Sequence, residues 1–458
     1  MECFTVLDYE VENRIDPHFY RPEFRKLKNK LGKLKNQKLG LIIEFSNETW
    51  NQKDLFDSEF PYIEISEIDI ETGEIRNISY YEKSKAPSRA KMIVRENDII
   101  VSTTRPHRGA ISLIDKEKNG FIASTGFAIL RKIKPDNVKR EYFLFLLRTQ
   151  LSLKQMLQRS SGGNYPAITS EELKNIIIPI PSLETQDKII ELMRKAYQKQ
   201  KEREAKAQQF LDSINNYVLD ELGIKLPELK DKMVYIVNSE EVQNKRADAY
   251  YYQPKFEEVE KAIKKGKFEV KELKEVIDFI PGYAFSSNDY VYNEGIKLLT
   301  IRNIKENFID LSDTTLLPND FFEKYDKFQI KNEDIVIAMT GATIGKSFIF
   351  NFDDKVLLNQ RVGIIRAKEK LNKYFLLSFI KTPLFKQKIL RQSCGGAQPN
   401  ISEYEITSIK IPLPPLSIQN KIAEEVKKRM QKAEQLQKEA KEKLGKAKKE
   451  VEQIILGG

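Results

Sequence analysis

The sequence contains few of the residues that build disulfide frameworks, metal sites or membrane segments. It has two cysteines, two histidines and one tryptophan in 458 residues. Cys3 and Cys394 are too few for a disulfide framework or a zinc knuckle, and His18 and His107 are too few for a histidine metal site. Apolar runs such as 176–180 are far shorter than the ~20 residues that cross a bilayer. We therefore expect no metal, no bound cofactor and no membrane segment.

The start of the sequence and its charge indicate where the protein works and what it meets. The opening MECFTVLDYEVENR has no apolar signal core and carries acids where a secretory signal carries bases, and isolated thiols are typical of a reducing compartment. We therefore expect a cytoplasmic protein. Lysine and arginine exceed the acidic residues to give a formal charge of +10. This excess favours a polyanionic partner such as double-stranded DNA, although composition alone does not require one.

An internal repeat dominates the sequence. GNYPAITSEELKNIIIPIPSLETQDKIIE, which begins at Gly163, returns without a gap as GAQPNISEYEITSIKIPLPPLSIQNKIAE, which begins at Gly396. Upstream, NRIDPHFYRPEF (from Asn13) resembles NKRADAYYYQPKF (from Asn244). ENDIIVSTTRPHRGAI likewise resembles NEDIVIAMTGATIGKS, and YFLFLLRTQ resembles YFLLSFIKTP. The chain is therefore a tandem duplication whose period is about half its length.

Each copy ends in a predicted long helix that follows Pro-rich stops and a serine N-cap at Ser182 or Ser417. Apolar residues step by alternating fours and threes along both helices, with polar interruptions such as Gln200 and Glu204, and this pattern is typical of a coiled coil. The predicted seam consists of Met193, Tyr197, Ala207, Leu211, Ile214, Val218, Val426, Met430, Ala433, Ala440, Leu444, Ala447 and Val451. A helix of ~40 residues is roughly 60 Å long. We expect the two helices to pair antiparallel within the chain; an intermolecular coiled coil or two ordinary amphipathic helices are the alternatives.

The remaining residues predict two mixed α/β globules, so the fold class is α/β (mixed α+β), with two pseudo-symmetric globules joined by two long antiparallel helices. We expect a first globule over 1–180, a first helix over 181–224, a second globule over 225–412 and a second helix over 413–458. The strand-like runs are Tyr62–Ile70, Asp98–Thr103, Phe127–Ile133, Lys297–Ile301, Asp334–Met339 and Arg361–Arg366. Helical stretches lie at Arg140–Arg159 and Lys373–Arg391, and a linker is expected at Leu222–Lys232.

Motifs for catalysis are weak. GATIGKS at 341–347 has three residues, where a phosphate-binding loop needs four, between its first glycine and Gly-Lys-Ser. Asp136, Glu172 and Lys174 imitate a nuclease Asp…Glu-x-Lys site, but the second copy does not repeat them. The Asn/Asp-Pro-Pro-aromatic tetrad of an amino-methyltransferase is absent from the sequence. The expectation is a chain that is not an enzyme by itself.

Polar residues on Gly- and Pro-punctuated loops are instead suited to DNA. Arginine and lysine pair with guanine, and asparagine and glutamine pair with adenine, in the major groove. Gly-Gly loops let the backbone approach a phosphate or base closely. The candidate DNA-binding residues are Arg105, His107, Arg108, Gly162, Gly163, Asn164, Tyr165, Arg302, Asn303, Thr340, Thr343, Lys346, Gln360, Arg361, Gly395, Gly396 and Gln398.

The doubled elements resemble a known family. Each copy has an R-x-D element, an acid-Ile strand with a Gly turn, a Gly-Gly loop and I-x-I-P-x-P-x-L-x-x-Q-x-K-I before its helix. In this order they resemble the specificity subunits of Type I restriction–modification systems over essentially the whole chain. The first-copy loop TTRPHRGA departs from the glycine-rich form of the second.

The resemblance implies a non-catalytic subunit whose globules are target recognition domains. It also implies that each globule reads one half of a split, asymmetric DNA target. Expected partners are two methyltransferase (modification) subunits, which supply S-adenosylmethionine chemistry, and a restriction/translocase subunit. Two other hypotheses remain open: a duplicated coiled-coil scaffold without sequence-specific DNA binding, and a nuclease that uses Asp136, Glu172 and Lys174.

Overall fold

The structure is a computed structural model that describes residues 5–6, 11, 14–51, 56–243, 246, 248–305, 308–393 and 399–457. The chain divides into two compact units. The first combines Met1–Glu204 with Gln437–Gly458, and the second is Ala205–Leu436. Each unit therefore contains part of both long helices, α6 (Leu183–Glu221) and α14 (Leu416–Leu456).

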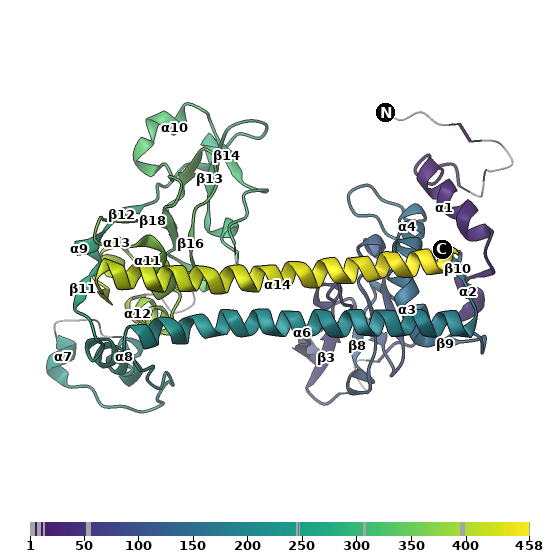
Figure 1. The fold of residues 1–458 in the computed structure, drawn as a ribbon, viewed down its shortest axis with the longest axis horizontal. Coiled ribbons are helices and arrows are strands. Elements are labelled where there is room, and N and C mark those ends of the chain that lie inside the picture. The colour runs from purple at the N-terminus through teal and green to yellow at the C-terminus, as the bar shows by residue number, and fades with distance from the viewer. Residues whose placement is uncertain are drawn as a thin grey trace. The chain divides into compact units, whose positions relative to one another are not determined.

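Two four-stranded sheets and a two-stranded ribbon form the β structure of the first unit (Figure 1). One sheet is antiparallel with the order β2-β9-β6-β7; the other has the order β4-β3-β8-β5, and its β3 and β8 are parallel. The strands are β1 (Asn36–Lys38), β2 (Ile43–Ser46), β3 (Glu59–Ile63), β4 (Ser79–Glu82), β5 (Ala90–Ile93), β6 (Ile99–Ser102), β7 (Ile111–Leu113), β8 (Ile122–Ser124), β9 (Phe127–Ile133) and β10 (Ile177–Pro179). The short helices are α1 (Pro22–Gly32), α2 (Leu39–Ile42), α3 (Arg140–Leu147), α4 (Gln150–Gln158) and α5 (Ser170–Lys174).

The second unit repeats this arrangement with one strand fewer in its mixed sheet. Its sheets have the orders β12-β18-β15-β16 and β14-β13-β17, with β13 and β17 parallel, and β11 pairs with β19. The strands are β11 (Val270–Glu272), β12 (Ile277–Pro281), β13 (Ile296–Leu299), β14 (Thr315–Leu317), β15 (Ile335–Ala338), β16 (Ser347–Ile349), β17 (Val356–Leu358), β18 (Val362–Ala367) and β19 (Lys410–Pro412). The helices are α7 (Ser239–Gln243), α8 (Pro254–Lys264), α9 (Leu273–Val276), α10 (Phe321–Lys324), α11 (Lys373–Ile380), α12 (Pro383–Gln392) and α13 (Glu403–Thr407). The mixed α/β fold with two repeated globules is confirmed.

The central strands of both units form because their residues favour extended backbone and are buried on both faces. Strand β6 reads IIVS and its counterpart β15 reads IVIA, and all of these residues are buried. An aspartate precedes each strand and pairs with an arginine from the neighbouring strand: Asp98 with Arg131, and Asp334 with Arg366, at 2.9 and 2.8 Å. The acid-Ile element of the repeat is therefore a structural part of the sheet.

Two predicted helices are each broken in two, at the same place. Arg140–Arg159 and Lys373–Arg391 were each expected to form one helix, but α3 ends at Leu147 and α11 ends at Ile380. A buried threonine lies at each break; the Oγ1 of Thr149 donates to the carbonyl of Leu146, and the Oγ1 of Thr382 to that of Phe379, both at 2.7 Å. In the second copy, proline follows that threonine and cannot continue the backbone hydrogen bonds of a helix.

Two other predictions of local structure are corrected. The strand expected over Tyr62–Ile70 ends at Ile63, because Glu64 and Glu67 form a capping box around a single 3₁₀ turn. The expected linker Leu222–Lys232 begins inside the core, where Leu222 and Ile224 are buried in the second unit. Gly223, with a φ of 66°, ends α6 in the left-handed conformation that glycine adopts without strain.

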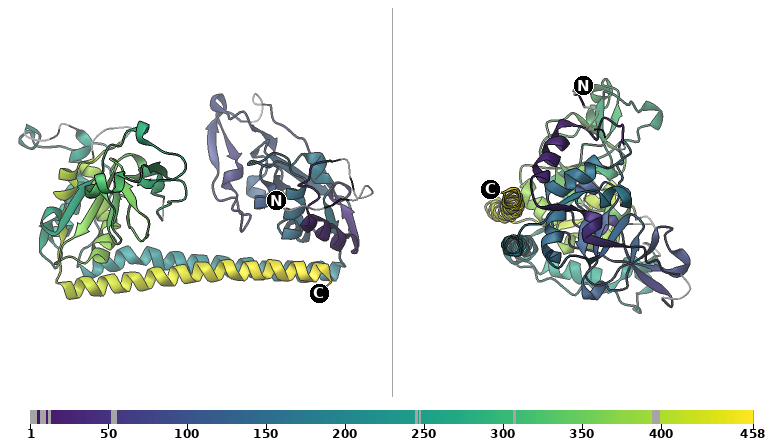
Figure 2. Two further views of the ribbon diagram at one scale, coloured as in Figure 1. Left: turned by 90° about the horizontal axis from the view of Figure 1, so that it is seen from above. Right: turned by 90° about the vertical axis from the view of Figure 1, so that its right-hand side faces the viewer.

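The long helices α6 and α14 pack antiparallel within each unit, and they run side by side in the views of Figures 1 and 2. Two contacts within the second unit give the direction: Lys421 lies 2.9 Å from Glu221, and the Nη1 of Arg429 donates to the carbonyl of Ser213 at 3.1 Å. As the residue number rises on one helix it falls on the other, so the expected antiparallel pair is confirmed.

Most of the predicted seam is enclosed, with one clear exception. Met193, Leu444 and Val451 belong to the main core of the first unit, and Val218 and Val426 to that of the second. The small residues Ala207, Ala433, Ala440 and Ala447 are also buried, while Tyr197, Leu211 and Ile214 are half-buried.

Met430 is the exception, because its side chain is 44% exposed. Arg429 reaches across to α6 at this level instead, where its Nη1 donates to Ser213 and its guanidinium lies over the Tyr217 ring. In the structure Met430 therefore lies largely outside the seam.

Candidate nucleic-acid interface

Two loops predicted to bind DNA lie against each other in the first unit. The loop after β6 carries Arg105, and its backbone N–H donates to the carbonyl of Pro166 at 2.6 Å. Ser161 and Ala167 exchange two backbone hydrogen bonds of 2.8 Å that close the Gly-Gly loop between them. The seven first-copy candidates are thus brought onto one surface: Arg105, His107, Arg108, Gly162, Gly163, Asn164 and Tyr165.

Basic and aromatic side chains lie together on this surface. The Arg105 guanidinium lies 4.1 Å from the centre of the Tyr165 ring, and Tyr165 is 70% exposed. Arg108 is exposed. Burial, helped by the charges of Arg108 and Arg105, lowers the pKa of His107.

The second unit builds an equivalent loop after β15. The backbone N–H of Gly341 donates to the carbonyl of Pro399 at 2.8 Å, just as Arg105 donates to Pro166. Thr340 and Thr343 are half-buried on this loop, and Lys346 follows them directly before β16. The other three second-copy loop candidates, Gly395, Gly396 and Gln398, lie outside the described residues.

Strand pairing places three further second-copy candidates beside that loop. Parallel strands β13 and β17 end side by side, so Arg302 follows one and Gln360 the other at the same edge. Arg361 comes next, and its carbonyl accepts the N–H of Met339, which follows β15. Arg302, Gln360 and Arg361 are all exposed. These three residues therefore lie at the same end of the β13-β17 and β15-β18 strand pairs as Thr340.

Asn303 is placed differently from the other candidates. It is 4% exposed, and its Oδ1 accepts from the backbone and hydroxyl of Thr300. Its amide donates to the carbonyls of Asp310 and Asp313. Its side chain holds this turn together from inside, so we leave Asn303 out of the interface proposed below.

Sequence reasoning missed residues that strand pairing brings to the same edges. In the first unit, the N–H of Thr125 donates to the carbonyl of the exposed Arg89 at 2.8 Å, next to the end of β8. In the second, Tyr283 is 39% exposed and its N–H donates to Leu358 at the end of β17. A Cβ on the preceding Gly282 would come 2.0 Å from the carbonyl oxygen of Asn359. In the sequence, the Gly282-Tyr283 pair is the local sign that the backbone comes close to Asn359 here.

The R-x-D element of the repeat anchors the base of each Gly-Gly loop. Arg14 donates to the carbonyl of Arg159 at 2.8 Å, where α4 ends. Arg246 donates to the carbonyls of Gln392 and Ser393, at 2.6 and 3.0 Å, where α12 ends. Each arginine therefore satisfies carbonyls that a helix C-terminus leaves without partners, and it holds the chain as it enters the loop.

The nuclease and phosphate-loop interpretations are not supported by the side chains. Glu172 is paired with Arg159 at 2.9 Å, and Lys174 with Glu171 at 2.7 Å, so both are engaged in local ion pairs. Gly341–Thr343 form a 3₁₀ turn that leads into strand β16, whereas a phosphate-binding loop opens a helix. Within the described ranges, His, Cys, Asp and Glu side chains form no cluster of three or more that could hold a metal ion.

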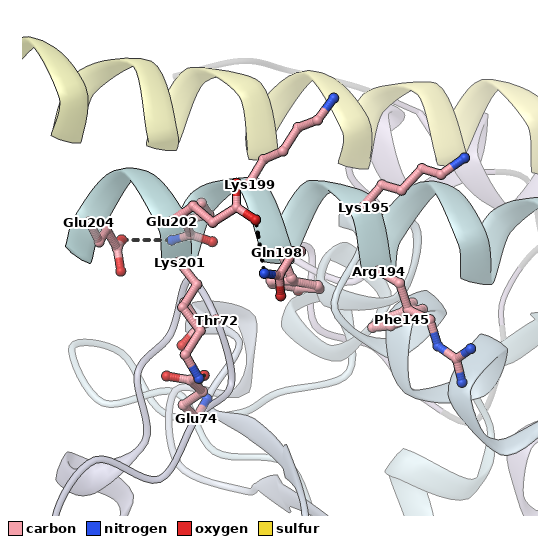
Figure 3. Close-up of a pocket in the computed structure, with 12 residues that line it drawn as sticks. Thr72, Glu74, Phe145, Arg194, Lys195, Gln198, Lys199, Lys201, Glu202 and Glu204 are labelled. Carbon is pink, nitrogen blue, oxygen red and sulfur yellow. Dashed lines mark hydrogen bonds and ion pairs between the residues drawn. The ribbon is translucent and has the colours of Figure 1, made fainter. Parts of the chain in front are cut away.

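An open groove of about 670 Å³ lies in the first unit between α6 and the turn at Thr72 (Figure 3). Figure 3 shows Lys201 extending from α6 toward Thr72 and Glu74, and its Nζ lies 3.8 Å from the Glu74 carboxylate. Stacked Phe145 and Tyr197 rings also line the groove. Its charged lining combines four basic residues with three acidic ones: Arg194, Lys195, Lys199 and Lys201, and Glu74, Glu202 and Glu204.

The family model for the Type I restriction modification DNA specificity domain matches the chain twice, over residues 32–209 and 265–445. The chain belongs to this family. The two matches fall on the two copies of the sequence repeat, so the duplication is a pair of specificity domains. Among the described residues, no helix is both long and apolar enough to span a bilayer.

Individual relatives agree with this assignment. The chain is 28% identical over 375 residues to the Type I restriction enzyme MjaVIII specificity subunit of Methanocaldococcus jannaschii, covering 80% of each sequence. It is 23% identical over 425 residues to the putative MjaX specificity subunit of the same organism, covering 87% of each. Its fold resembles a chain in a solved structure whose subject is complex assembly and conformational transition of the type I R-M system. That match has a TM-score of 0.51 and 20% identity, and it covers 92% of this chain and 97% of the other.

Proposed function

We propose that this chain selects the DNA target of a Type I restriction–modification complex. One observation carries the proposal: each specificity domain presents polar loops at the same sheet edge, and the two copies present different side chains there. Arg105 and Arg108 stand in the first loop, whereas Thr340 and Thr343 stand in the second. Two dissimilar readers on one chain fit a split and asymmetric target, since base-edge contacts specify sequence while phosphate contacts only position the protein.

The proposal divides the chain into four parts. Residues 1–180 and 225–412 are two target recognition domains, and 181–224 and 413–458 are helices that space them. The DNA-binding set leaves out the buried Asn303. It consists of Arg105, His107, Arg108, Gly162, Gly163, Asn164, Tyr165, Arg302, Thr340, Thr343, Lys346, Gln360, Arg361, Gly395, Gly396 and Gln398. The excess positive charge of +10 adds phosphate attraction to these base contacts.

The chain itself performs no chemistry in this proposal. Two methyltransferase subunits bind it and supply S-adenosylmethionine, and a restriction/translocase subunit joins for cleavage. The complex works in the cytoplasm. The engaged Glu172 and Lys174 side chains support the absence of a nuclease site.

The test is to purify the chain with a modification methyltransferase from the same genome and to map methylated adenines by single-molecule sequencing. We expect a split, asymmetric motif that disappears when this chain is omitted. Methylation that is unchanged without the chain would refute the proposal and favour a scaffold role.

A further inference from the structure

Arg105 and Gly341 occupy the same position in the two recognition loops. Each directly follows a threonine that bridges to the Gly-Gly segment, Thr104 to Ala167 and Thr340 to Asn400. Each donates its N–H to a proline carbonyl, and each loop closes four residues later on a glycine with a φ of 81°. The two loops therefore have the same backbone path with a different residue at the tip.

That tip has a conformation that suits glycine better than arginine. The φ of Gly341 is 68°, and the φ of Arg105 is 48°. A residue with a Cβ adopts this left-handed region at a cost, whereas glycine does not. Since glycine makes the same turn in the second copy, the turn itself does not require arginine. The reason for arginine must lie in its side chain.

The Arg105 side chain is held as a planar, outward-facing fork. Its guanidinium stacks on Tyr165 at 4.1 Å, and its Nη2 donates to the carbonyl of Asn164 at 3.2 Å. Its Nε and Nη1 make no hydrogen bond to any residue that the structure describes. A fork that is already oriented loses little freedom when it meets the O6 and N7 acceptors of guanine, and it matches their spacing.

We propose that Arg105 reads a guanine in the half-site of the first domain, and that the second domain has no equivalent reader because Gly341 stands there. This inference rests on the proposed function. It deepens that function by naming one base and the residue that recognises it.

The test uses the full chain in complex with its methyltransferase, on duplexes that carry the mapped motif with one base pair replaced at a time. For Arg105→Gly we expect discrimination to fall about 5- to 150-fold at one G·C pair of one half-site and to be kept elsewhere. Because glycine fits this turn, the melting temperature should stay within about 3 °C of the unmodified protein. An unchanged preference at every position would overturn the proposal, as would a fall of more than about 6 °C.

Arg105→Lys separates base reading from phosphate binding. Lysine keeps the charge but not the fork, so we expect it to lose the same discrimination. If lysine restores full discrimination, or if Arg105→Gly weakens binding to all sequences and lowers the salt dependence by about one phosphate contact, the proposal is wrong. Arg21→Ala is the matched control, an exposed arginine of the first unit outside the recognition loops, and it should leave that G·C preference in place.

The proposed function can fail separately. If the unmodified chain confers no motif on its methyltransferase, the specificity role itself falls. A motif that is present but insensitive to Arg105→Gly overturns only the guanine assignment.

Discussion

Gln419, in the first turn of α14, bonds to Asn372, the N-cap residue of α11. Its Oε1 accepts the backbone N–H of Asn372 at 2.7 Å. Its Nε2 donates to the carbonyls of Lys370 and Pro414. In the first unit, Gln186 makes the corresponding three bonds, of which the bond from Lys139 measures 2.8 Å. This explains the glutamine in the repeated I-P-x-P-x-L-x-x-Q motif.

Replacing either glutamine should therefore destabilise its own unit. Gln419→Leu leaves a backbone N–H and two carbonyls without partners, and we expect a loss of roughly 2 kcal/mol or more in urea unfolding. Gln419→Glu keeps the acceptor but turns a buried carboxylate oxygen toward these two carbonyls, so it should cost at least as much. Gln198→Leu, an exposed glutamine of α6, is the control and should change stability by no more than about 0.5 kcal/mol. Equal effects of the Leu variants at 198 and 419 would contradict this reading.

Lys448 should make stability depend on alkaline pH. Burial and the nearby Arg148 lower the pKa of its amine to about 8, against the partial opposition of Glu71, Asp69 and Glu452. Between about pH 8 and 10.5 the unfolded chain then binds more protons than the folded chain, so folding stability should rise with pH in this window.

The variant Lys448→Met removes the buried charge. We expect it to stabilise the protein most below pH 8, by up to about 3 kcal/mol, and the difference to vanish near pH 10.5. Lys449→Met, at an exposed neighbour on α14, should show no such trend. A pH-independent difference between Lys448→Met and the unmodified protein would exclude this explanation.

Loosening the base of one Gly-Gly loop should affect one half-site only. Arg246→Ala removes the donors to Gln392 and Ser393, and we expect faster amide exchange at residues 391–393 together with weaker recognition by the second domain. Arg14→Ala is the counterpart and should weaken recognition by the first domain. The readout is methylation of duplexes altered in either half-site, and loss at both halves from one substitution would argue against separate readers.

One buried and one exposed residue of α14 allow a direct check of the helix seam. Ala433 is 1% exposed, so Ala433→Leu should overpack the helix pair and cost about 1–3 kcal/mol. Met430→Leu on the same helix should be nearly neutral, because Met430 is largely outside the seam. A larger cost at 430 than at 433 would restore the original seam assignment.

The sequence predicted what depends on local pattern and missed what depends on distant pairing. Heptad spacing and the repeat were sufficient for the helix pair and the two globules. The breaks at Thr149 and Thr382 were missed, because a helical stretch of apolar residues continues across both. Asn303 looked like a loop residue, but its partners Asp310 and Asp313 are brought to it by a turn that no local pattern reveals.

The loop surfaces were found residue by residue but not as assemblies. Arg105 and Tyr165 are far apart in the sequence, and the fold brings them together through the backbone bond from Arg105 to Pro166 and the stacking of the guanidinium on the Tyr165 ring. Tyr283 was not considered, because the parallel pairing of β13 with β17 decides which turns become neighbours.

The first unit is built from two segments that are far apart in the sequence, and this affects its folding during synthesis on the ribosome. Its core includes Leu444, Val451 and Ile455, which are translated more than two hundred residues after Met193, beside which they are buried. The second unit, Ala205–Leu436, has all of its residues available earlier. The domain that begins first is therefore the one that is completed last, and until then Ile189, Ile190 and Met193 present an apolar strip that a nascent chain must keep from aggregation.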